Sequence, residues 1–92
     1  MNNENPGKAD LEAMARAEAM EWSLAHLWAH FLNNTDNPEE TMAEVARRSV
    51  ALVQEPAAQE TDARAREFMH RMVLHSEAHW DRVAVILRTM RG

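Results

Sequence analysis

The chain has 92 residues, of which 46% are hydrophobic and 27% are charged, a length and composition that support one folded domain with a thin core rather than a disordered chain. It contains no Cys, which excludes disulfides, thiolate metal ligands and thiol nucleophiles. Its net charge of −5 argues against non-specific nucleic-acid binding, because affinity for phosphates depends on Lys and Arg.

Helix-forming residues dominate the sequence. Ala, Leu, Met, Glu and Arg are abundant, Tyr is absent and β-branched residues are few, which favours helices over strands. No stretch has the ~20 apolar residues that a membrane span requires, and the N-terminus is polar rather than a basic and then apolar signal. We therefore expect a cytoplasmic all-α protein, with a disordered polar N-terminus over residues 1–8 and a single helical domain over residues 9–92.

The first predicted helix spans about residues 9–32, between Pro6-Gly7 and Asn33-Asn34, which suits a helix end. Apolar residues cover well over half of its circumference, which is more than one neighbouring helix can bury. We therefore expect its surplus face to contact a second copy in a homodimer. The predicted interface consists of Met20, Leu24, Leu27, Trp28 and Phe31, together with Trp80 from the last helix.

The second predicted helix spans about residues 38–54 and has a clear start. Asn37 is typical of a helix cap, Pro38 of the first helical position, and Glu39 and Glu40 favour the positive end of the helix dipole. Its apolar residues recur on one side only, which predicts packing on that side. We expect Pro56 to end this helix.

The third predicted helix spans about residues 58–90, after the polar connection Gln54–Asp62, in which its start is not well marked. It has a broad apolar face, and Arg88 and Arg91 suit the negative end of its dipole. Short connections favour antiparallel neighbours. We therefore predict a three-helix up-down-up bundle in which the first and third helices run parallel.

Two His-x-x-x-His spacings are the main chemical pattern: His26 with His30 on the first helix, and His75 with His79 on the third. Such a spacing places two imidazoles one turn apart on one helix face, where they could bind zinc, iron or haem. His26 and His30 fall on the polar side of their helix, whereas His75 and His79 fall on or beside the apolar side. If the helices start near residues 9 and 58, both pairs lie at similar heights.

Other sites have weaker support. The three Ser residues lie in mid-helix and no Gly-rich phosphate loop occurs, which argues against an enzyme. Arg residues of the second and third helices could bind DNA or an acidic partner, or could pair with local Glu. We therefore expect a small non-catalytic interaction or assembly module, with the process and any further protein partner left open. The alternative is a metal- or haem-binding helical protein that uses the paired histidines.

Overall fold

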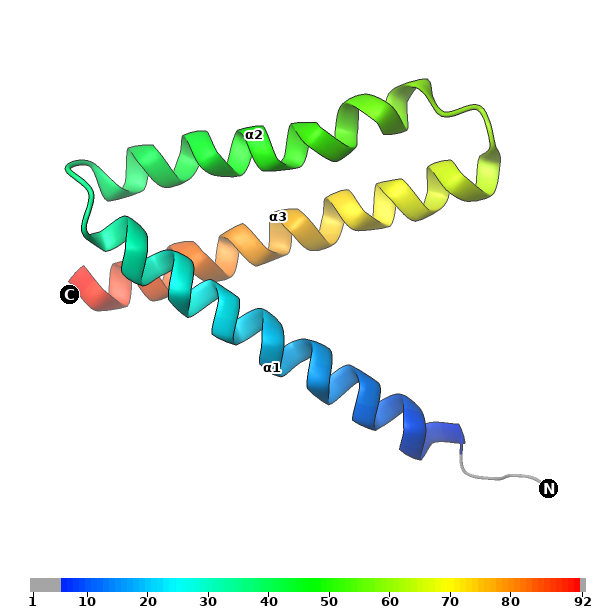
Figure 1. The fold of residues 1–92 in the computed structure, drawn as a ribbon, viewed down its shortest axis with the longest axis horizontal. Helices are drawn as coiled ribbons and strands as arrows, with labels where there is room; N and C mark the ends of the chain where they lie inside the picture. The colour runs from blue at the N-terminus through cyan, green and yellow to red at the C-terminus, as the bar shows by residue number, and fades with distance from the viewer. Residues whose placement is uncertain (1–5, 92) are drawn as a thin grey trace.

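The computed structural model describes residues 6–91, which form three helices: α1 (Pro6–Asn33), α2 (Pro38–Gln59) and α3 (Ala63–Arg91) (Figure 1). No strand occurs within this range, which confirms the predicted all-α class. α1 begins three residues earlier than expected, because the fixed φ of Pro6 suits a first helical turn. Residues 6–8 of the predicted polar N-terminus are therefore helical, and residues 1–5 lie outside the described residues.

α3 packs against both other helices, whereas α1 and α2 touch each other little. α2 runs antiparallel to α3, and α1 runs in the same general direction as α3 (Figure 1). α1 meets α3 near the C-terminal ends of both helices and diverges from it toward the N-terminus (Figure 1). The helix packing supports the predicted bundle, but α1 contacts α3 along only part of its length.

The connection between α1 and α2 is short and well bonded. The Thr35 hydroxyl donates to the carbonyl of Leu32 at 2.6 Å, which satisfies one of the free carbonyls at the end of α1. α2 starts with Pro38 at its first position, as predicted, and Pro38 is buried. Asn37 occupies the N-cap position, as predicted, although its side chain makes no capping hydrogen bond.

α2 continues through Pro56 to Gln59, so the expectation that Pro56 ends the helix is also wrong. Pro56 is exposed, so water can hydrate the carbonyl that loses its N–H partner. The next residue, Ala57, is buried, and this packing favours continuation of the helix. α3 begins at Ala63 rather than near residue 58, where the Asp62 carboxylate accepts the N–H of Ala65 at 2.9 Å.

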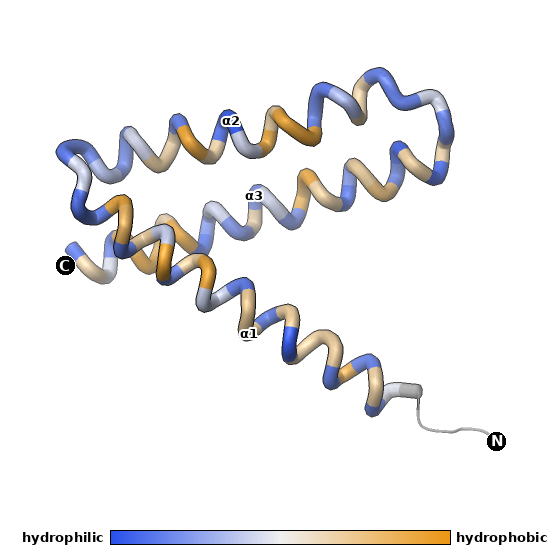
Figure 2. The backbone as a smooth tube through the Cα atoms, viewed as in Figure 1, coloured by the Kyte–Doolittle hydropathy of each residue, from blue (hydrophilic) through white to orange (hydrophobic). Residues whose placement is uncertain are grey.

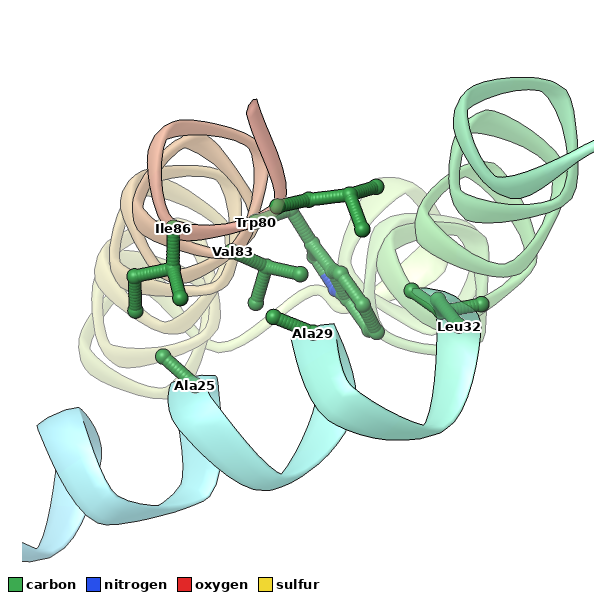
Figure 3. Packing of buried hydrophobic residues seen from close by; sticks show 7 residues of the cluster. Ala25, Ala29, Leu32, Trp80, Val83 and Ile86 are labelled. Carbon is green, nitrogen blue, oxygen red and sulfur yellow. The ribbon is translucent and has the colours of Figure 1, made fainter. Parts of the chain in front are cut away.

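The core lies where α1 crosses α3 (Figure 3). Two alanines of α1, Ala25 and Ala29, are fully buried there, and their small side chains allow the helices to approach closely. Trp28, Met42, Val45, Ala46 and Val50 are partly buried against the core. The buried cluster comprises Ala25, Ala29, Leu32, Trp80, Val83, Ile86 and Leu87.

The molecule is flat and extended for its length. Its backbone measures 56 × 34 × 14 Å along its principal axes, so the shortest dimension is a quarter of the longest. Its radius of gyration is 16.6 Å, whereas a compact domain of 92 residues has one of about 12 Å. Hydrophobic residues recur along all three helices (Figure 2). A single copy therefore lacks the second layer that normally covers such surfaces.

Candidate functional site

The first candidate site is an apolar row on the side of α1 that faces away from the core. Met20, Leu24, Leu27 and Phe31 follow one another at spacings of four, three and four residues, which places them on one side of the helix. Each is between 47% and 66% exposed. We call these four residues the α1 stripe. Three of them, Met20, Leu24 and Leu27, border a shallow groove together with Ala19, Glu21 and Ser23.

The other two predicted interface residues lie elsewhere. Trp80 is buried in the core and Trp28 is partly buried, with the two rings 5.2 Å apart. Trp28 also contacts Phe31 of the α1 stripe edge to face, with ring centroids 6.1 Å apart. Both tryptophans therefore pack at the core of the single chain, and Trp28 links that core to Phe31 of the α1 stripe.

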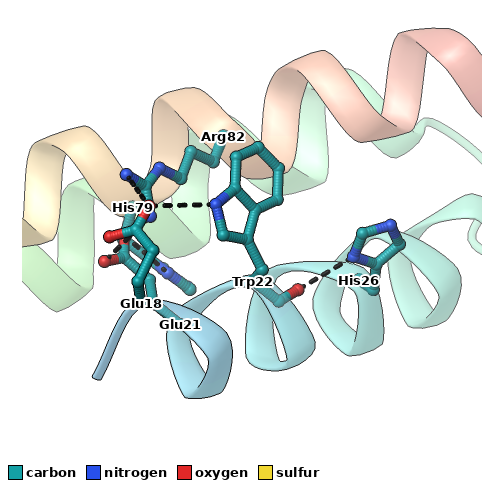
Figure 4. A network of polar contacts seen from close by, with 6 residues as sticks. All are labelled: Glu18, Glu21, Trp22, His26, His79 and Arg82. Carbon is teal, nitrogen blue, oxygen red and sulfur yellow. Dashed lines mark hydrogen bonds and ion pairs between the residues drawn. The ribbon is translucent and has the colours of Figure 1, made fainter. Parts of the chain in front are cut away.

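A polar cluster joins α1 to α3 beside the core (Figure 4). Arg82 of α3 contacts two carboxylates of α1, through Nη2 to Glu18 Oε2 at 2.6 Å and Nη1 to Glu21 Oε1 at 3.1 Å. Its guanidinium also lies over the Trp22 ring, 4.9 Å from the centroid, while Trp22 Nε1 donates to Glu18 at 3.0 Å. Arg82 is thus held between two acids and an aromatic ring at the point where α1 leaves α3.

His79 belongs to the same cluster. Its side chain is only 13% exposed, with Nδ1 3.7 Å from Glu21 Oε2, a contact that is an ion pair only when the imidazole is protonated. Its Nε2 is buried without a hydrogen-bond partner, as is Arg82 Nη1, whose approach to Glu21 is close but poorly aligned for a hydrogen bond. The carboxylate beside His79 is that of Glu21 on α1, whereas Glu77 and Asp81 of α3 are exposed.

The two His-x-x-x-His pairs do not converge. His26 is exposed and its Nδ1 lies 2.9 Å from the Trp22 carbonyl on its own helix. His30 and His75 are exposed, and His79 alone enters the contact between α1 and α3. In the described residues, no group of three or more His, Asp or Glu is arranged to hold a metal ion.

The arginines of α2 and α3 form local ion pairs. Glu44 Oε2 accepts hydrogen bonds from Arg47 Nη2 at 2.6 Å and from Arg48 Nε at 2.7 Å. Arg71 Nε lies 2.8 Å from Glu67 Oε2. The hydrogen bonds from Arg47 and Arg48 lower the pKa of Glu44, and the same contact raises the pKa of Arg47. These pairs match the local-pairing interpretation of the sequence.

Sequence reasoning missed the polar cluster. The helical spacing places Glu18 and Glu21 on the same side of α1 as the buried Ala25. Because a carboxylate that is removed from water needs a partner of opposite charge, this placement predicts a cation on the facing helix. No partner for Arg82 was predicted from the sequence. The signal was therefore present, but recognising it requires knowing which sides of α1 and α3 meet.

The chain matches no family model, no curated protein and no solved structure. Of the helices described, none is both long and apolar enough to cross a membrane. Function is therefore inferred from the α1 stripe, the polar cluster and the shape of the fold.

Proposed function

We propose that this protein is a small non-catalytic assembly module that forms a homodimer through α1. The observation that carries the proposal is the α1 stripe, in which four large apolar residues in one row are about half exposed or more. Contiguous apolar surface of this kind is typical of protein interaction sites. A second copy is the simplest partner, because two-fold assembly lets one self-complementary surface cover itself.

The total surface of the chain supports the same proposal. A folded monomer of 10.5 kDa is expected to have about 5,400 Å² of accessible surface, whereas this chain has 6901 Å². The excess is about 1,500 Å², and a standard interface buries about 800 Å² on each partner. Self-association removes surface that the single chain leaves in water.

The experiment is native mass spectrometry with sedimentation equilibrium on untagged protein. We expect a dimer for the natural sequence and a dissociation constant raised about tenfold or more by Leu27→Glu, which places a charge inside the α1 stripe. Leu52→Glu is the matched control, because Leu52 is 78% exposed on α2 and lies outside the stripe. A monomeric natural protein, or equal dissociation constants for the two variants, would contradict the proposal.

A further inference from the structure

α1 and α3 diverge toward the N-terminus of α1 (Figure 1), and a groove, which we call the cleft, lies between them there. We call residues 6–20 of α1 the arm. On the side of the arm toward α3, Leu11 and Met14 border a groove of about 530 Å³ that His75 closes from α3. Phe68 and Met72 precede His75 at spacings that continue the same side of α3, and both are exposed. The walls are therefore apolar where the helices are furthest apart, at Leu11 and Met14 of α1 and at Phe68 and Met72 of α3, whereas Glu18 and Glu21 line the groove nearer the core.

The arm carries a second apolar side. Ala13 and Met20 lie on its outer side and run into the α1 stripe, whereas Leu11, Met14 and Ala17 border the cleft. All five residues are exposed. Helices that are apolar on more than one side are normally covered on more than one side. In the single chain, neither side of the arm is covered.

The α1 stripe alone is too small for a stable dimer. Complete burial of its four side chains would remove roughly 500 Å² from each copy, compared with about 800 Å² per partner in a standard interface. The two walls of the cleft are the nearest exposed apolar surface, and the outer side of the arm joins them to the stripe. A dimer that also used the cleft would reach the required area.

We propose that the arm of a second copy fills this cleft, and that the arm of the first copy fills the cleft of the second around a two-fold axis. The cleft sides of the two arms then face each other, and the outer side of each arm covers Phe68 and Met72 of the other copy. The product is a four-helix arrangement of both α1 and both α3 helices. This inference depends on the proposed homodimer and specifies its geometry.

Cysteine crosslinking tests the arrangement directly, since the natural sequence has no Cys. One preparation carries Ala13→Cys on the outer side of the arm and another carries Met72→Cys. The two are mixed, equilibrated and treated with a short bifunctional thiol reagent, and the mixed crosslinked product is quantified by mass. A matched mixture replaces Ala13→Cys with Leu52→Cys, which is fully accessible on α2. All three positions are exposed, so folding should be retained, and circular dichroism verifies it.

We expect about tenfold more mixed product from the Ala13 and Met72 pair than from the Leu52 and Met72 pair, because residence in one complex raises the effective concentration of the two thiols. A dimer with equal yields from both mixtures would overturn the reciprocal insertion while leaving the homodimer intact. A monomeric mass for the natural protein would overturn both proposals. A third outcome, in which an added unrelated amphipathic helix lowers the mixed yield as much as added natural protein does, would show that the cleft accepts other helices and would also refute the reciprocal insertion.

Discussion

Substitution of Arg82 by Met should destabilise the fold substantially, because Met fills a similar volume but leaves the Glu18 and Glu21 carboxylates without their cation. Arg82 is 28% exposed and Glu21 29%, so this pair is poorly hydrated, whereas Glu18 is 52% exposed and can regain water. Removal of one partner from a buried pair costs about 3–5 kcal/mol and from an exposed pair at most about 1 kcal/mol. We therefore expect a loss of about 2 kcal/mol.

The assay is urea denaturation followed by far-ultraviolet circular dichroism at one fixed protein concentration, because dimerisation makes stability depend on concentration. A loss of about 2 kcal/mol lowers the urea midpoint by about 1.5 M if the m-value is about 1.3 kcal/mol/M. Arg16→Met is the matched control, since Arg16 pairs with Glu12 at 3.3 Å with both side chains exposed. Equal midpoints for the two variants would refute the importance of the cluster. Glu21→Gln added to Arg82→Met should restore part of the loss, because it removes an unpaired charge.

Two further predictions concern pH and metal. The pKa of Glu44 is lowered below its ordinary value of 4.5 in the fold, so its pairs with Arg47 and Arg48 stabilise the protein above that value and are lost as pH falls through the lower folded pKa. Glu44→Gln should therefore lower the urea midpoint at neutral pH and lose this effect as pH falls through the lowered folded pKa of Glu44, and an effect that stays equal throughout such a pH series would contradict this. In equilibrium dialysis against zinc, we expect less than one ion per chain, because within residues 6–91 His75 and His79 belong to no group of three ligands that could hold a metal ion. Binding of one zinc ion per chain that is lost in the His75→Ala variant would contradict this prediction.

Local sequence signals predicted the helices well. Composition and apolar periodicity were sufficient for an all-α chain of three helices, and Pro38 marked the start of α2 correctly. The ends near Pro56 and Asp62 were predicted less well, because tertiary packing of Ala57 and an Asp cap decided them. Those effects depend on which residue is buried and which side chain accepts a backbone N–H, and neither follows from periodicity alone.

Relations between helices were harder to predict. The first and third helices were expected to be parallel with the histidine pairs at similar heights, but α3 starts five residues later than assumed and α1 crosses it at an angle (Figure 1). Trp28 was assigned to a free surface, yet it packs on Trp80. Such errors arise because a helical wheel shows how wide an apolar face is and leaves open which part of it a neighbour covers.

The sequence of α1 explains why its arm leaves the body of the protein. From Ala25 onward the side facing α3 carries alanine, which allows close apolar contact, whereas Glu18 and Glu21 occupy the same side one to two turns earlier. Carboxylates need a cation and partial hydration, so the two helices cannot approach each other there as closely as they do at the alanines. Arg82 fills the wider space between them. Beyond this cluster the two helices diverge further (Figure 1), and Leu11 and Met14 remain exposed. The polar cluster therefore sets the position of the cleft, and the proposed dimer fills that cleft.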